Sequence, residues 1–72
     1  MKLGIYQHYK NKQFYKVIGV AKHSETLEDL VVYEALYDNL RSKLWVRPLA
    51  MFIEDVEVDG VYVPRFNFIK EK

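Results

Sequence analysis

Hydrophobic and polar residues alternate with a period of two along most of the chain, which is typical of β-strands. In residues 4–10, Tyr6 and His8 fall on one face of such a strand, and Ile5 and Tyr9 fall on the other. Residues 14–22 repeat the alternation, and the glycine inside this segment, Gly19, predicts a bulge or a sharp bend. The first third of the chain is therefore expected to form two strands, the second of them bent.

Two further strands are expected in the middle of the chain. Residues 30–37 contain two valines and two tyrosines, which favour a strand. Residues 44–47 form a short strand that ends at Pro48, because proline has no backbone N–H to donate to a sheet. The polar segments 23–29 and 38–43 are predicted to be loops.

The last third of the chain contains a tight hairpin. The dipeptide Asp59-Gly60 lies between two valine-rich segments and is the strongest short-range signal for a two-residue hairpin turn. Pro64 follows the second of these segments, so the last strand either lies at the edge of a sheet or breaks at this proline. Before the hairpin, residues 48–52 are expected to form a tight turn.

The predicted elements amount to about five or six short strands, at intervals of roughly 8–12 residues, with at most a helical or 3₁₀ turn. This pattern favours an all-β fold. A chain of 72 residues forms one domain, residues 1–72, and is too short to fill two packed sheets. We therefore expect a small antiparallel SH3-like barrel, because closure of the sheet removes its exposed edges.

The amino-acid composition limits the classes of function that this chain can have. The 11 Lys and Arg residues nearly balance the 10 Asp and Glu residues, so a net charge of +1 gives no strong electrostatic argument for nucleic acid. No apolar run approaches the ~20 residues of a membrane-spanning helix, and the strand pattern begins at once, so we expect no membrane segment and no signal peptide. The absence of cysteine excludes disulfides, thiol chemistry and Cys-based zinc sites. A cytoplasmic protein without a cofactor is expected.

Several uncommon motifs occur together and in one order. They are residues 4–10, 15–28, 44–52, 56–60 and 64–66. This combination, which covers most of the chain, resembles a bacterial family catalogued as domain of unknown function 1653. One departure is Asn11, where members of the family tend to have glycine, and asparagine can take the positive φ angle of such a turn at little cost. The family has no established activity, cofactor or site residues, so the resemblance implies kinship and no particular function.

The pair formed by Trp45 and Arg47 is the most suggestive binding feature. The two residues share one face of a strand, and an aromatic ring beside a guanidinium is typical of peptide hot spots and stacked ligands. If Val46 points into the core, the pair faces outward and is free to bind. In the alternative, Trp45 fills the barrel. Arg47 then pairs with Glu34 or Glu54 on the surface.

Tyrosines extend this candidate face. Together with Trp45, we expect Tyr6, Tyr33 and Tyr37 to line a groove, as aromatic side chains do in small barrels that bind extended peptides. The leading hypothesis is a non-enzymatic binding module for a peptide or protein partner or a small ligand. A monomer or a weak homodimer fits this hypothesis.

The loop that contains His23, Ser24, Glu25 and Thr26 is expected at the rim of this face. It combines a base, hydroxyls and a carboxylate, and binding residues concentrate on loops. In the alternative, the loop shows only turn chemistry, with its hydroxyls bonded to nearby backbone amides and His23 flanking a bend.

Two other function classes stay open. A nucleic-acid-binding accessory domain would stack bases on the same aromatic residues and hold the phosphates with Lys16, Lys22 and Arg65, and added salt would weaken its binding steeply. A small hydrolase would need three side chains within reach of one substrate atom, those of His8, His23 and Glu25. No spacing of ligand residues is typical of a metal site, so no metal ligand and no catalytic residue is predicted.

Overall fold

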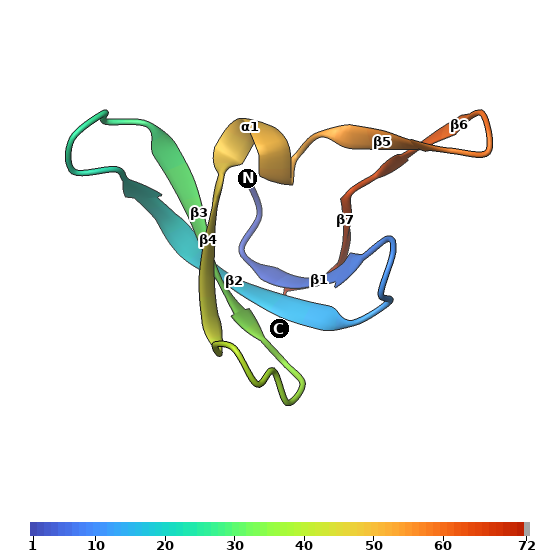
Figure 1. Cartoon of the computed structure of the whole chain (residues 1–72), viewed down its shortest axis with the longest axis horizontal. Coiled ribbons are helices and arrows are strands. Elements are labelled where there is room, and N and C mark those ends of the chain that lie inside the picture. The colour runs from blue at the N-terminus through green and yellow to red at the C-terminus, as the bar shows by residue number, and fades with distance from the viewer. Residues whose placement is uncertain (72) are drawn as a thin grey trace.

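The computed structural model describes residues 1–71, and more than half of them lie in strands (Figure 1). The elements follow in the order β1 (Gly4–His8), β2 (Phe14–Lys22), β3 (Asp29–Ala35), β4 (Leu44–Pro48), α1 (Leu49–Phe52), β5 (Asp55–Val58), β6 (Val61–Pro64) and β7 (Phe66–Lys70). All strand pairs are antiparallel, and the predicted small all-β fold is confirmed. Within residues 1–71, no helix has the length and apolar character that crossing a membrane requires.

Five of the strands form one curled sheet in the order β4-β3-β2-β1-β7, and β5 pairs with β6 as a separate hairpin. This hairpin projects from the body as an arm, drawn in orange in Figure 1. The predicted closure into a barrel does not occur in residues 1–71, because β4 and β7 are not paired with each other. Instead, α1 directs Phe52 against aromatic rings of β1, β3 and β7 and covers the space between the edges.

The aromatic side chains gather on one face of the curled sheet, which we call the inner face. Tyr6 pairs with Tyr15 on one side and with Phe68 on the other. Tyr33 lies opposite Trp45. Directly opposite side chains in an antiparallel sheet point to the same face. The buried core consists of Tyr6, Tyr15, Val17, Val31, Tyr33, Ala35, Phe52 and Phe66.

Two local predictions are confirmed by the backbone. The register between β2 and β3 shifts between Val17 and Gly19, so Ile18 is left without a partner in a β-bulge. At the predicted hairpin, Asp59 and Gly60 both have positive φ angles, of 51° and 80°. A type I′ turn requires this geometry at both central residues.

Two other expectations need correction. In the β1–β2 turn, Lys12 and not Asn11 takes the positive φ angle, of 60°, while the side chain of Asn11 accepts a backbone hydrogen bond. The chain after the hairpin breaks at Pro64, one of the two expected outcomes, and a corner at Arg65 separates β6 from β7. The N–H of Arg65 donates to Glu54, and its carbonyl accepts from Tyr9. The fold therefore has seven strands where about five or six were expected.

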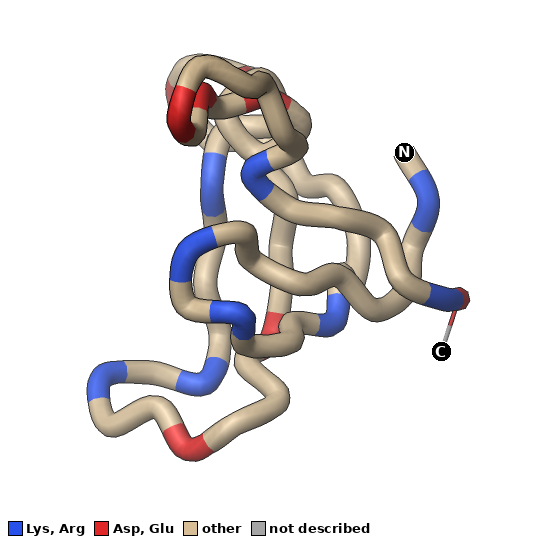
Figure 2. The backbone as a smooth tube through the Cα atoms, turned by 90° about the vertical axis from the view of Figure 1, so that its right-hand side faces the viewer, with Lys and Arg blue, Asp and Glu red and all other residues tan. Residues whose placement is uncertain are grey.

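Charge is distributed unevenly over the chain. Residues 54–64, which form the arm, contain four acidic residues and no lysine or arginine. The β1–β2 turn instead contains Lys10 and Lys12. In Figure 2 several acidic positions, drawn in red, gather at the top of the molecule, and most of the lysines and arginines, drawn in blue, lie below them. The arm and the turn thus carry opposite charges.

Candidate functional site

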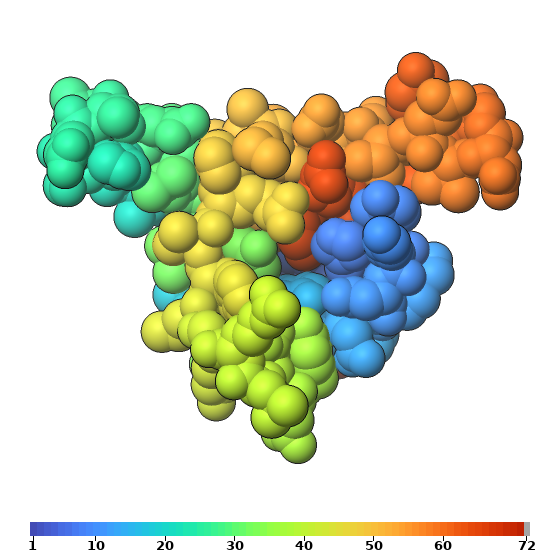
Figure 3. Space-filling view, in the orientation of Figure 1, coloured from blue at the N-terminus to red at the C-terminus, as the bar shows by residue number. Residues whose placement is uncertain are grey.

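At one end of the inner face, the aromatic core opens into a small cavity of about 220 Å³. We call this cavity the Arg47 pocket. It is lined by His8, Asn11, Tyr15, Tyr33, Asn39, Trp45, Arg47 and Phe66. Figure 3 shows the hollow between the yellow segment of β4, the blue β1–β2 turn and the red segment that leads into β7. Strands and loops that are distant in sequence therefore meet at this pocket.

Arg47 is half-buried on one side of the pocket. Its Nε donates a long hydrogen bond of 3.4 Å to the hydroxyl oxygen of Tyr33, and its guanidinium carbon lies 5.6 Å from the centre of the Phe66 ring. The ion pairs of residues 1–71 are Lys22–Asp29, Lys43–Glu34 and Arg65–Glu54. Arg47 takes part in none of them, so no carboxylate of this part of the chain neutralises its charge.

Trp45 is also half-buried on the inner face. Its ring Nε1–H donates to the carbonyl oxygen of Ser42 over 2.9 Å, which fixes the ring at the pocket. The neighbouring Val46 is 59% exposed on the opposite face of β4. The interpretation that placed Val46 in the core is therefore wrong. The alternative is not met either: Trp45 is partly buried and packs against the core of a sheet that stays open, and Arg47 bonds to Tyr33 and pairs with neither glutamate.

Two tyrosine hydroxyls and two asparagine amides form a hydrogen-bonded chain beside the pocket. The hydroxyls of Tyr15 and Tyr37 lie 2.7 Å apart. Asn11 Nδ2 donates to Tyr15, and Asn39 Nδ2 donates to Tyr37, each over 3.0 Å. Burial raises the pKa of Tyr15, and the hydrogen bond with Tyr37 raises it further. The hydroxyl of Tyr15 is therefore neutral at physiological pH.

His8 stands at the end of β1, where its ring meets that of Phe66 edge-on with 4.9 Å between the centroids. Its Nδ1 accepts a hydrogen bond from the backbone N–H of Lys10 over 3.1 Å, so the proton of the neutral ring is on Nε2. Burial, followed by the positive charges of Arg47, Arg65 and Lys10, lowers the pKa of His8 below its usual 6.5. At pH 7 His8 therefore contributes a hydrogen-bond donor and no charge.

The lowered pKa of His8 makes stability depend on pH. Below about pH 6.5 the unfolded chain binds a proton at His8 more readily than the folded chain does, so the free energy of unfolding should fall as the pH falls through this range. Urea denaturation at pH 8 and pH 5.5 measures the difference. In His8→Gln the difference should shrink. An equal change in His23→Gln would contradict the assignment to His8.

The structure brings part of the predicted binding set together. Three predicted residues line the Arg47 pocket, namely Tyr33, Trp45 and Arg47. Tyr37 lies next to them through its hydrogen bond to Tyr15. Tyr6 lies elsewhere in the core, where burial raises its pKa and its hydroxyl donates to a backbone carbonyl over 2.6 Å. Tyr6 therefore supports the core and does not contact the pocket.

The loop from His23 to Thr26 lies at the end of β2 opposite to Tyr15, in the hairpin tip at the upper left of Figure 1. The Nδ1 of His23 accepts hydrogen bonds from the backbone N–H groups of Glu25 and Thr26. The hydroxyl of Thr26 also accepts from a backbone N–H, and Ser24 is exposed. These contacts are turn chemistry, and the loop does not line the Arg47 pocket.

The residues of the two alternative functions are not gathered at one place. His8 lies at the end of β1 near the pocket, whereas His23 follows the far end of β2. No group of three metal-ligating side chains occurs within residues 1–71. Of the three cations expected for nucleic acid, Lys16 lies on the outer face of β2, Lys22 at the hairpin tip and Arg65 at the β6–β7 corner.

Sequence reasoning does not identify several pocket residues as binding residues. It indicates His8 only as a candidate for catalysis, and Tyr15 only as part of an alternating strand. A sequence signal exists for both, because each shares the face of Tyr6 once β1 is paired with β2. Asn39 lies in the irregular loop before β4, where no periodic signal exists.

Comparisons with known proteins agree with the motif pattern. The model of the family described as Protein of unknown function (DUF1653) matches residues 4–68. The crystal structure of a DUF1653 protein from Bordetella bronchiseptica is similar to this chain, with a TM-score of 0.89 and 33% sequence identity. The similarity covers 96% of this chain and 87% of the other. No curated protein matches the chain. The family match spans almost the whole fold, and the chain therefore belongs to the DUF1653 family.

Proposed function

We propose that this protein is a non-enzymatic binding module and that the Arg47 pocket is its binding site for a peptide, a protein partner or a small ligand. The observation that carries the proposal is a half-buried arginine beside aromatic rings, with no acidic partner within residues 1–71. A partly desolvated cation without a counter-charge is unfavourable, and a ligand that supplies acceptors relieves this.

The aromatic walls support a binding role. Trp and Arg are the residue types most enriched among binding hot spots, together with Tyr, and all three types meet at this pocket. Small SH3-like sheets bind extended peptides on such aromatic surfaces. The same proposal includes an SH3-like character for the curled sheet and a cytoplasmic location for the protein.

A screen of displayed random peptides tests the proposal. The wild-type protein should enrich specific peptides, and Arg47→Met should not, because methionine keeps an apolar side chain and removes the guanidinium. Arg41→Met is the matched control, since Arg41 is an exposed arginine in the loop before β4 and does not line the pocket. Enriched peptides should also change the fluorescence of Trp45, the single tryptophan.

Two results would contradict the proposal. The first is a screen in which the wild-type protein and Arg47→Met enrich the same peptides. The second is binding to single-stranded nucleic acid that weakens steeply with added salt, which would favour the nucleic-acid alternative instead.

A further inference from the structure

The polar groups that face the Arg47 pocket are hydrogen-bond donors. Arg47 uses Nε for its bond to Tyr33, and its terminal nitrogens donate to no other group of residues 1–71. The hydroxyl of Tyr33 accepts that bond, so its own hydrogen is free to donate. Neutral His8 adds the Nε2–H donor that its bond to Lys10 leaves available. Three side chains thus present donors and no charged acceptor.

The hydrogen-bonded network of two tyrosines and two asparagines contains one more donor hydrogen than it has acceptors for. The side-chain oxygens of Asn11 and Asn39 accept backbone N–H groups, which fixes both amides so that their NH₂ groups face the hydroxyls. The bond between Tyr15 and Tyr37 uses one of their two hydroxyl hydrogens. The other hydroxyl hydrogen has no acceptor within this network, because both asparagine NH₂ groups donate to the hydroxyls and accept nothing from them. The network therefore offers a further donor beside the pocket.

The charge and size of the pocket limit what it accepts. No aspartate or glutamate lines it, and with His8 neutral it contains one full positive charge, that of Arg47. Its 220 Å³ is less than the ~300–1,000 Å³ of pockets that enclose a drug-sized ligand. The pocket therefore admits a single terminal group. The rings of Trp45 and Phe66 give that group an apolar wall.

As a deepening of the proposed function, on which it rests, we propose that the Arg47 pocket recognises a carboxylate attached to an apolar group, as at the C-terminus of a peptide with a hydrophobic last residue. An ionised carboxylate accepts hydrogen bonds and donates none, and it matches the fork of a guanidinium with two parallel bonds. Its single negative charge balances Arg47. A phosphate dianion would exceed that charge, and phosphate sites rely on clustered backbone N–H groups that this aromatic wall lacks.

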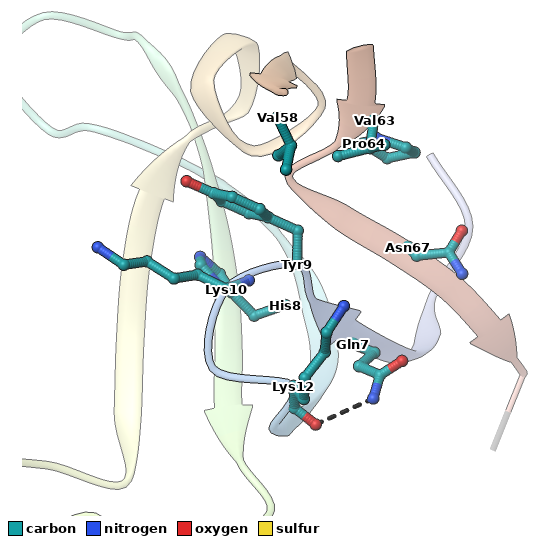
Figure 4. Close-up of a pocket in the computed structure, with 9 residues that line it drawn as sticks. All are labelled: Gln7, His8, Tyr9, Lys10, Lys12, Val58, Val63, Pro64 and Asn67. Carbon is teal, nitrogen blue, oxygen red and sulfur yellow. Dashed lines mark hydrogen bonds between the residues drawn. The ribbon is translucent and has the colours of Figure 1, made fainter. Parts of the chain in front are cut away.

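A neighbouring groove gives the rest of such a peptide a place to lie. This groove, of about 570 Å³, lies between the β1–β2 turn and the β5–β6 arm and is shown in Figure 4. Its lining comprises Gln7, His8, Tyr9, Lys10, Lys12, Val58, Val63, Pro64 and Asn67. His8 lines both cavities, so it marks where they adjoin. Gln7 Nε2 donates to the carbonyl of Lys12 over 3.0 Å and holds the turn that forms one wall.

The decisive experiment compares two peptides that differ only at the C-terminus. An N-acetylated tetrapeptide ending in leucine is titrated into the wild-type protein at pH 7.5 with a free carboxylate and as the C-terminal amide, and the fluorescence of Trp45 is followed. Amidation should weaken binding about 10- to 100-fold, because it removes a charge-assisted bond. N-acetyl-leucine and inorganic phosphate are titrated in parallel. N-acetyl-leucine should bind more weakly than the peptide, and phosphate should bind weakest.

Variants assign the effect to the pocket. Arg47→Met should abolish the preference for the free carboxylate, whereas Arg41→Met should keep it. Tyr33→Phe should weaken binding of the free-carboxylate peptide several-fold, while the phenylalanine ring keeps its place in the core. If thermal melts show that Arg47→Met does not fold, Tyr33→Phe decides the question.

Each adverse outcome has a definite meaning. Equal binding of the free and amidated peptides overturns carboxylate recognition, and Arg47-dependent enrichment in the peptide screen then leaves the proposed function in place. Tighter binding of phosphate than of the peptide, or no binding of the free-carboxylate peptide, likewise overturns carboxylate recognition. Equal affinity for N-acetyl-leucine and the peptide overturns the peptide as the source of the carboxylate and assigns the pocket to small free acids.

Discussion

Replacing Phe52 with alanine should lower the free energy of unfolding by about 3–5 kcal/mol, the range for removing a fully buried phenylalanine. The side chain of Phe52 is 1% exposed. Its ring stacks on Phe66 with centroids 4.1 Å apart, and it meets Tyr6 and Tyr33 edge-on at 5.4 Å. A small domain is stable by about 0.05–0.15 kcal/mol per residue, so this loss is a large part of the total. Denaturant unfolding followed by circular dichroism measures it.

Met51→Ala is the matched control for this prediction. Met51 precedes Phe52 in the same helical turn, but it is 46% exposed. Its replacement should change the unfolding free energy by less than about 1 kcal/mol. A similar loss in both variants would mean that α1 contributes through its backbone. A loss below about 1 kcal/mol in Phe52→Ala would contradict the conclusion that the Phe52 ring stabilises the open sheet by covering it.

Gly4→Ala should be nearly as damaging, with a loss of about 3 kcal/mol or more. Gly4 has a φ angle of 144°, in a region that residues with a side chain rarely adopt. A Cβ at this position would collide with the carbonyl of Lys70 and lie 2.8 Å from the Cα of Glu71. Both are backbone atoms, so β1 and the end of β7 would have to separate. Thermal melting with circular dichroism detects the loss.

Gly19→Ala provides the comparison. Nothing lies within 4 Å of where a Cβ on Gly19 would be, and its φ angle is outside the left-handed region. Alanine also reduces the conformational entropy of the unfolded chain, so Gly19→Ala should be neutral or slightly stabilising, by up to about 1 kcal/mol. If the two variants melt at the same temperature, the close approach at Gly4 does not matter for stability.

Local features of this fold were predictable from the sequence because they depend on neighbouring residues. Alternation placed Tyr6 and His8 on one face, the isolated Gly19 indicated a bulge, and Asp59-Gly60 indicated a tight turn. Each signal lies within a few residues and follows from backbone geometry. The open edges of the sheet were not predictable in the same way. They depend on how α1 and the arm are placed, which no local pattern specifies.

The inner face of β4 shows why the candidate site could be predicted only in part. Leu44 and Val46 form one apolar face of this strand, and Trp45 forms the other with Arg47. Alternation alone does not say which face is buried. The pairing of Trp45 with Tyr33 decides it, because Tyr33 belongs to the core. Sequence could therefore identify the aromatic–arginine pair but not the cavity, whose other walls come from β1, β2, β3, β7 and two loops.

The pairing of β1 with β7 has a consequence for the order of events during synthesis. β1 leaves the ribosome before the other strands of this fold, yet one of its two neighbours is the last of these strands, with His8 opposite Phe66. The β2–β3 hairpin depends only on nearby residues and can form on the nascent chain, whereas pairings between distant segments form late. Phe66 is at once a core residue and a wall of the Arg47 pocket. The nascent protein therefore gains its pocket only when β7 emerges, and a chain released before Phe66 lacks both a complete core and a ligand site.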